Sequence, residues 1–143
     1  MTTMMKRAGW RTEAALFDGY EAVMRACGLE RSSDAGAAIL GRVGPRIRPH
    51  HIARRNMELV FPEASTREID GLLSAMWDNL GRVAGELPHL PRLDLSGQGE
   101  HVRIEGLDIL RAIQREGRPI LLFGGHFANW EVLVGTVATQ IPG

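Results

Sequence analysis

The apolar periodicity of this 143-residue chain changes near residue 100, and that change limits the folds it can adopt. Before residue 100, apolar residues recur at steps of three and four, which is the spacing of an amphipathic α-helix. After residue 100 the pattern becomes a short alternating run, a helical stretch, a compact apolar run and a second helical stretch. This order predicts strand–helix–strand–helix over 101–140, which is the start of an α/β fold with a mixed or parallel sheet.

Four helices are predicted before residue 94, at about 12–27, 32–40, 49–61 and 66–87. Capping residues, glycines and prolines mark their ends. The last helix is the best marked, because Ser65 and Glu68 form a capping-box pattern in which hydroxyl and carboxylate satisfy free backbone N–H groups. Trp77 is predicted to be a core anchor beside an apolar stripe made of Ile69, Leu72, Leu73, Met76, Leu80, Val83, Ala84 and Leu87.

The two predicted strands are 101–104 and 119–123. Polar and apolar residues alternate in the first, and the second is a compact apolar run flanked by glycine and proline, which is typical of a buried parallel strand. Two parallel strands leave both edges of a sheet unpaired, and a sheet of two strands is not stable alone. We therefore expect a truncated sheet and a chain that is the N-terminal part of a longer protein.

Composition excludes several classes of protein. Hydrophobic residues make up 44% and charged residues 24%, which is ordinary for a globular domain and unlike collagen or a disordered chain. The charges of the 17 basic and 17 acidic residues cancel, so binding of nucleic acid through excess positive charge is not expected. The single cysteine, Cys27, forms no internal disulfide and no thiolate cluster. The longest apolar run is four residues, far below the roughly 20 of a spanning helix, and no secretory signal is apparent.

Charge is unevenly placed. Residues 41–55 hold five arginines and no acid, while the rest of the chain has 12 basic and 17 acidic residues. Guanidinium groups suit phosphate and carboxylate oxygens. The segment therefore indicates either a solvated face or a site for anionic headgroups or an acidic partner protein.

The segment 123–131 is where chemistry is expected. It leaves a predicted strand through Gly124 and Gly125 and enters a helix, which is the place where open α/β folds carry active sites. If His126 precedes the first helical turn, its ring can fold back onto Glu131. The carboxylate would then orient the ring and stabilise imidazolium, and the free ring nitrogen would take a proton from a substrate hydroxyl. No serine or cysteine lies nearby as a nucleophile, so direct attack by the acceptor hydroxyl is the simpler route.

The same residues also fit a loop histidine followed by an acid in the first turn of a helix, where the helix dipole favours negative charge. A metal site is not predicted, because His50 and His51 are adjacent and no acid or histidine cluster has ligand spacing. Neither phosphate-binding glycine fingerprint occurs.

The sequence GHFANWE at 125–131 resembles the H-x-x-x-x-D/E motif of the bacterial lipid A biosynthesis acyltransferases, the late lauroyl and myristoyl transferases of the glycerolipid acyltransferase superfamily. Residues 53–63, ARRNMELVFPE, are similar to the R-x-N-L-x-x-x-F-P block of that family. Residues 79–82 with Glu86 resemble the helix that follows it, and 106–122 resembles the approach to the motif. The resemblance covers roughly residues 35–140, and its specific part is the ordered set of motifs.

The resemblance implies transfer of an acyl group from an acyl carrier protein or coenzyme A thioester to a hydroxyl of a phosphorylated glycolipid, without a cofactor. It implies that His126 is the general base and Glu131 its partner, with Gly125 and Asn129 in the substrate site. Arg54 and Arg55 would lie near membrane phosphate or the acidic carrier. The implied partners are the donor, the glycolipid acceptor and the inner membrane surface, with no nucleic acid.

Two departures from the family pattern shape the remaining expectations. Family members usually begin with a hydrophobic anchor, which is not seen in this N-terminus. Residues 1–34 are therefore predicted to be an amphipathic helical segment, whose helix 12–27 binds the cytoplasmic face of the inner membrane peripherally. Residues 35–143 are predicted to be the N-terminal part of an acyltransferase domain, helical over 35–93 and inactive without later motifs. A thioester hydrolase and an inactive membrane- or carrier-binding module remain alternatives.

Overall fold

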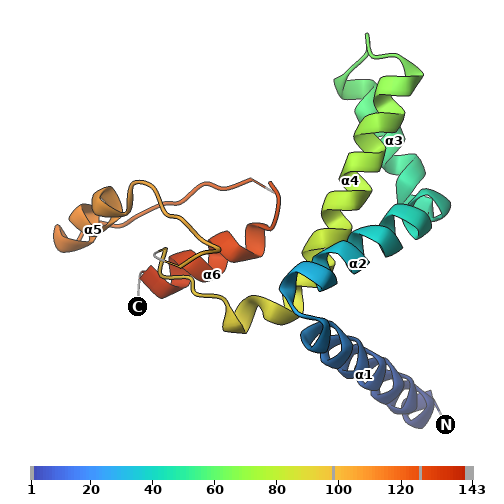
Figure 1. Ribbon diagram of the computed structural model, residues 1–143, viewed down its shortest axis with the longest axis horizontal. Coiled ribbons are helices and arrows are strands. Elements are labelled where there is room, and N and C mark those ends of the chain that lie inside the picture. The colour runs from blue at the N-terminus through green and yellow to red at the C-terminus, as the bar shows by residue number, and fades with distance from the viewer. Residues whose placement is uncertain (1, 98, 126, 141–143) are drawn as a thin grey trace. The chain divides into compact units, whose positions relative to one another are not determined.

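The computed structural model describes residues 2–97, 99–125 and 127–140, and Figure 1 shows their helices. The α-helices are α1 (Thr2–Cys27), α2 (Leu29–Val43), α3 (Arg48–Val60), α4 (Thr66–Glu86), α5 (Leu107–Arg115) and α6 (Trp130–Gln140). Two short 3-10 helices, η1 (Gly44–Arg46) and η2 (Leu87–Arg92), complete the regular structure. The chain divides into two units, Met1–His89 and Leu90–Gly143. The prediction that divides the chain at residue 34 concerns anchoring and catalysis, which this division does not test.

The first unit is organised by direct backbone contact between α2 and α4, which lie side by side (Figure 1). A Cβ atom on Gly36 would lie 2.0 Å from the carbonyl oxygen of Gly81, and one on Gly81 would lie 2.4 Å from the carbonyl oxygen of Gly36. One turn further on, a Cβ on Gly85 would lie 2.0 Å from the carbonyl oxygen of Ser32. The two helices therefore touch through positions where any side chain larger than hydrogen is excluded.

Trp77 closes the other end of this helix pair. The ring is 4% exposed, and a Cβ on Gly44 would lie 2.2 Å from its Cδ2 atom. The indole Nε1 donates a hydrogen bond of 3.0 Å to Nδ1 of His50 on α3, and the two rings stack with centroids 6.4 Å apart. Since indole nitrogen only donates, Nδ1 of His50 carries a lone pair here. The predicted role of Trp77 as a core anchor is confirmed.

Among the described side chains of α1, those near its C-terminal end pack against the rest of this unit. Met24 is buried, and the hydroxyl of Tyr20 donates to the carbonyl oxygen of Ala84. Burial raises the pKa of the Tyr20 hydroxyl, because the charged form loses solvent. Further toward the N-terminus the same face is exposed, with Trp10 64% and Phe17 60% accessible.

The helix predictions for the first unit are confirmed with shifts at the ends. Ser65 and Glu68 form the capping box, and these hydrogen bonds hold the pKa of the Glu68 carboxyl below its usual range. The second helix begins earlier than expected, because Gly28, with φ of 81°, already provides the break. Ser32 therefore lies inside α2, buried, and its hydroxyl contacts the carbonyl oxygens of Met24 and Gly28 at 2.6 and 2.7 Å.

The predicted α/β fold is wrong: the part of the chain that the structure describes contains helices and irregular segments but no strand. Residues 101–104 and 119–123 are irregular, and Leu121 and Phe123 are 76% and 89% exposed. An apolar or alternating run forms a strand only when a neighbouring strand takes its backbone hydrogen bonds, about 4.8 Å away. No described segment occupies that position, so these residues have the sequence pattern of strands but no partner strand to pair with. The predicted helices around these runs are observed as α5 and α6.

The first prediction from the fold concerns backbone protection. Amides at 119–123 have no ladder partner among the described residues, whereas those of α4 are bonded within a helix that is partly buried. Hydrogen–deuterium exchange should therefore be much faster at 119–123 than at 69–85. Equal protection of the two segments in a monomeric sample would contradict the irregular assignment.

The second prediction concerns the glycine contact. Replacing Gly36 by Ala forces a methyl group into a backbone oxygen and should destabilise the protein by about 1–3 kcal/mol, measured by urea unfolding. Gly41→Ala is the matched control on the same helix, because a Cβ there meets nothing within 4 Å. The control should raise stability by about 0.5–1 kcal/mol through helix propensity. Equal effects of the two changes would refute the close approach of α2 and α4.

Candidate functional site

The candidate site is the junction between the irregular residues 118–125 and 127–129 and helix α6. Glu131 is the second residue of α6, half-buried, and Asn129 immediately precedes the helix. The backbone carbonyl of Asn129 accepts a 3.1 Å hydrogen bond from the N–H of Val132, which starts the first turn. The free N–H groups of this helix end give it partial positive charge, and Glu131 is the acid placed there.

The chain enters α6 through a sharp reversal at Ala128. Its φ is 47°, the one positive value recorded for a residue other than glycine among those described. An alanine in this left-handed region crowds its Cβ against the backbone, at a cost of about 1–2 kcal/mol. Strained backbone of this kind concentrates at functional sites, because the surrounding structure holds a geometry that the chain alone would not choose.

The glycines before the reversal keep space open. A Cβ on Gly125 would lie 2.5 Å from the ring of Phe127, and one on Gly124 would lie 3.2 Å from Leu133 of α6. The ring of Phe127 is 85% exposed, so it can rotate away from a Cβ atom. The requirement for glycine is therefore weaker at position 125 than the short distance suggests.

An apolar cavity of about 540 Å³ lies beside this junction. Trp130 and four aliphatic residues of α6 form one side, and the residues leading into the motif form the other. The lining residues are Leu122, Phe123, Gly124, Gly125, Trp130, Leu133, Val134, Val137 and Ala138. With no ionisable side chain in its lining, the cavity favours a hydrocarbon group over a polar one.

The structure distributes the predicted site residues over both units. Gly125, Asn129 and Glu131 share the junction, while His126 lies outside the described residues. Arg54 and Arg55 belong to α3 in the first unit. Arg54 forms an ion pair with Asp70 of α4, which ties α3 to α4, and Arg55 is exposed.

Sequence reasoning did not identify the apolar cavity. Its signal is weak, because Leu133, Val134 and Val137 also fit the ordinary apolar face of a helix. Among the described residues, no group of three or more His, Cys, Asp and Glu side chains could hold a metal ion.

The bacterial lipid A biosynthesis acyltransferase family matches residues 22–143, most of the chain and both units. The chain belongs to this family.

Individual relatives agree with this assignment. The chain is 30% identical over 96 residues to the lipid A biosynthesis palmitoleoyltransferase of Escherichia coli (strain K12), in an alignment covering 64% of this chain and 31% of the relative. The lipid A biosynthesis acyltransferase of Shigella flexneri aligns with the same identity and the same coverage. The chain thus spans about a third of the length of these relatives. No solved structure gives a significant match.

Proposed function

We propose that the protein transfers a fatty acyl group from an acyl carrier protein or coenzyme A thioester to a hydroxyl of a phosphorylated glycolipid, a lipid A precursor. The observation that carries this proposal is the family match through the H-x-x-x-x-E sequence, together with the apolar cavity beside it. A hydrocarbon chain of the donor suits that cavity by size and polarity.

In the proposed reaction, His126 removes the proton from the acceptor hydroxyl as its oxygen attacks the thioester carbonyl carbon. Glu131, in the first turn of α6, stabilises the imidazolium that results. The tetrahedral intermediate then collapses: the carbon–oxygen bond remains, the carbon–sulfur bond breaks, and the thiolate recovers the proton from His126. Residues 97–143 contain no serine or cysteine, and their two threonines, Thr136 and Thr139, lie outside the motif. This composition favours direct attack by the acceptor hydroxyl over an acyl-enzyme intermediate.

We further propose that the protein works at the cytoplasmic face of the inner membrane. No described helix is long and apolar enough to cross a bilayer. Support for peripheral binding comes from α1, whose apolar face is exposed at Trp10, Leu16 and Phe17. An amphipathic helix of this kind buries such a face in the headgroup region of a membrane.

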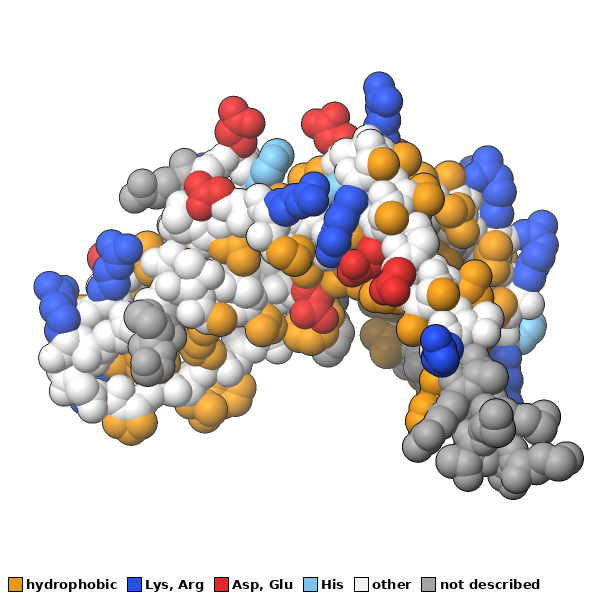
Figure 2. All heavy atoms as spheres, turned by 90° about the horizontal axis from the view of Figure 1, so that it is seen from below, with side chains coloured by type: hydrophobic (Ala, Val, Ile, Leu, Met, Phe, Trp, Pro, Cys, Tyr) orange, Lys and Arg blue, Asp and Glu red, His pale blue; other side chains and the backbone are white. Residues whose placement is uncertain are grey.

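The arginine-rich segment 41–55 also supports the proposal that the protein binds a membrane surface. Ile52 of α3 is 56% exposed, and Leu59 and Val60 of the same helix are 72% and 66% exposed. Exposed hydrophobic side chains next to exposed arginines suit an anionic membrane surface. On the face of the molecule that Figure 2 shows, hydrophobic and basic side chains both reach the surface. The Arg54–Asp70 ion pair neutralises one charge of this segment and leaves four exposed arginines, Arg42, Arg46, Arg48 and Arg55. The last three are the ones to test.

Substitution of His126 tests the chemistry. In the whole protein, His126→Ala should lower acceptor-dependent release of the acyl carrier by about 10²–10⁴-fold, because it removes the general base. Glu131→Gln keeps the shape of the side chain but removes its charge, so it should also lower turnover while donor binding survives. His101→Ala is the control, an exposed histidine in the same unit. Near-normal transfer by folded His126→Ala would end the proposed mechanism, and equal carrier release without acceptor would identify a hydrolase.

Vesicle sedimentation tests the membrane surface. Replacing Arg46, Arg48 and Arg55 together by Gln should weaken binding to phosphatidylglycerol vesicles by about 100-fold at low salt, at ~1 kcal/mol for each basic residue. The control replaces three exposed arginines elsewhere, Arg31, Arg103 and Arg118. Binding that changes neither with the first set nor with salt would leave 41–55 as a solvated face.

A further inference from the structure

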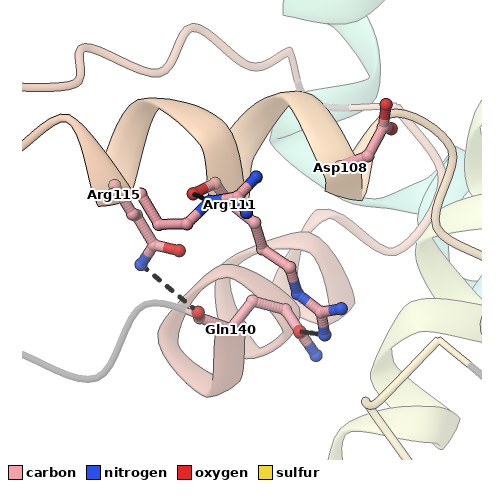
Figure 3. A pocket seen from close by; sticks show the side chains of 5 residues that line it. Asp108, Arg111, Arg115 and Gln140 are labelled. Carbon is pink, nitrogen blue, oxygen red and sulfur yellow. Dashed lines mark hydrogen bonds between the residues drawn. The ribbon is translucent and has the colours of Figure 1, made fainter.

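A second cavity of the Leu90–Gly143 unit lies along α5, beside the C-terminal end of α6 (Figure 3). Its volume is about 670 Å³, and it is lined by Asp108, Arg111, Gln114, Arg115 and Gln140. Unlike the cavity at the motif, its lining is made of polar and charged side chains. This composition calls for a polar occupant.

Three hydrogen bonds organise the walls of this cavity. Nη2 of Arg111 donates to Oε1 of Gln140 at 3.5 Å, and Nε2 of Gln114 donates to the backbone oxygen of Gln140 at the same distance. Figure 3 shows Arg111 reaching from α5 toward Gln140 on α6. Nε of Arg115 donates to the carbonyl oxygen of Arg111 at 3.3 Å, so the two arginines sit one turn apart on one side of α5.

The two guanidinium groups lack the neutralising partners that neighbouring arginines have. Arg103 pairs with Glu105 at 2.6 Å, and Arg118 pairs with Glu116 at 3.0 Å. Among the described residues, no carboxylate pairs with Arg111 or Arg115. Two cations against the single carboxylate of Asp108 give the cavity net positive charge.

Most donors in the cavity remain available. A guanidinium carries five N–H donors, and each of these arginines uses one in the hydrogen bonds above. Planar forks of this kind match the oxygens of phosphate in a bidentate manner. We propose that the cavity between α5 and α6 binds a phosphate group of one of the two substrates, with Arg111 and Arg115 as its principal ligands.

Two substrates of the proposed reaction carry phosphate, so the role of this site rests on the proposed function. One source is the donor, whose coenzyme A or carrier-linked pantetheine is phosphorylated. The other is the glycolipid acceptor. The shared chemistry is a phosphate held by two guanidinium groups, and the two sources are separated by choice of probe.

The test is titration calorimetry of the protein with coenzyme A and, separately, with glucosamine 1-phosphate, with unphosphorylated glucosamine as the chemical control. Arg111→Gln and Arg115→Gln should each raise the Kd of a phosphate probe by about tenfold or more. Arg115→Lys, which keeps the charge but not the fork, should fall between wild type and Arg115→Gln. The matched control is Arg103→Gln with Arg118→Gln, which removes two exposed arginines of the same unit and should leave the Kd unchanged.

Each result decides something. Weakening with coenzyme A alone places the donor at the site, weakening with the sugar phosphate alone places the acceptor there, and weakening with both supports a site for either phosphate. An unchanged Kd for both probes in folded Arg111→Gln and Arg115→Gln, or glucosamine binding equal to that of its phosphate, overturns the proposal. His126→Ala should leave these Kd values unchanged, so loss of the phosphate site and loss of the proposed catalysis are read separately.

Discussion

The contact on which the first unit depends is the approach of two backbones. Gly36 of α2 faces Gly81 of α4, and Gly85 faces the carbonyl of Ser32, at distances that leave no room for a Cβ atom. Helices this close bring their small residues into van der Waals contact along a full turn, and the larger side chains Ile69, Leu73 and Trp77 fill the space at one end. The position of α3 follows from this, because His50 and Arg54 bind Trp77 and Asp70 of α4.

The end of α1 is held at the other end of the same helix pair. Ser32, His89 and the carbonyl oxygen of Met24 meet there, with Nε2 of His89 3.0 Å from the Ser32 hydroxyl and 3.1 Å from the Met24 carbonyl. These polar groups are buried, so each needs the hydrogen bonds that the others provide. Nearer the N-terminus, the described side chains of Trp10, Leu16 and Phe17 on α1 are exposed. This division of the helix into a packed and an exposed part underlies the proposed attachment to a membrane.

In the second unit, two cavities of opposite character flank α6. The apolar one runs along α6 from Trp130 to Ala138, and the charged one includes Gln140, the last residue of the same helix. A substrate with a hydrocarbon chain and a phosphorylated head needs both kinds of surface.

The amino-acid sequence alone determined the local elements and the family. Ser65 and Glu68 mark the start of α4, Gly28 and Gly117 mark helix ends, and the ordered motifs at 53–63 and 125–131 identify a lipid A acyltransferase relative, because each of these signals acts over a few residues. Tertiary structure decided the rest. Glycines 36, 81 and 85 look like weak helix positions until another helix lies against them. Of the expected apolar stripe, Ile69 and Leu73 are buried together with Trp77, whereas Leu72 and Leu80 are exposed, because the contact with α2 covers only part of α4. The apolar run at 119–123 has the composition of a strand, but a strand exists only where a second segment accepts its hydrogen bonds, and that is a property of the assembled chain rather than of the run itself.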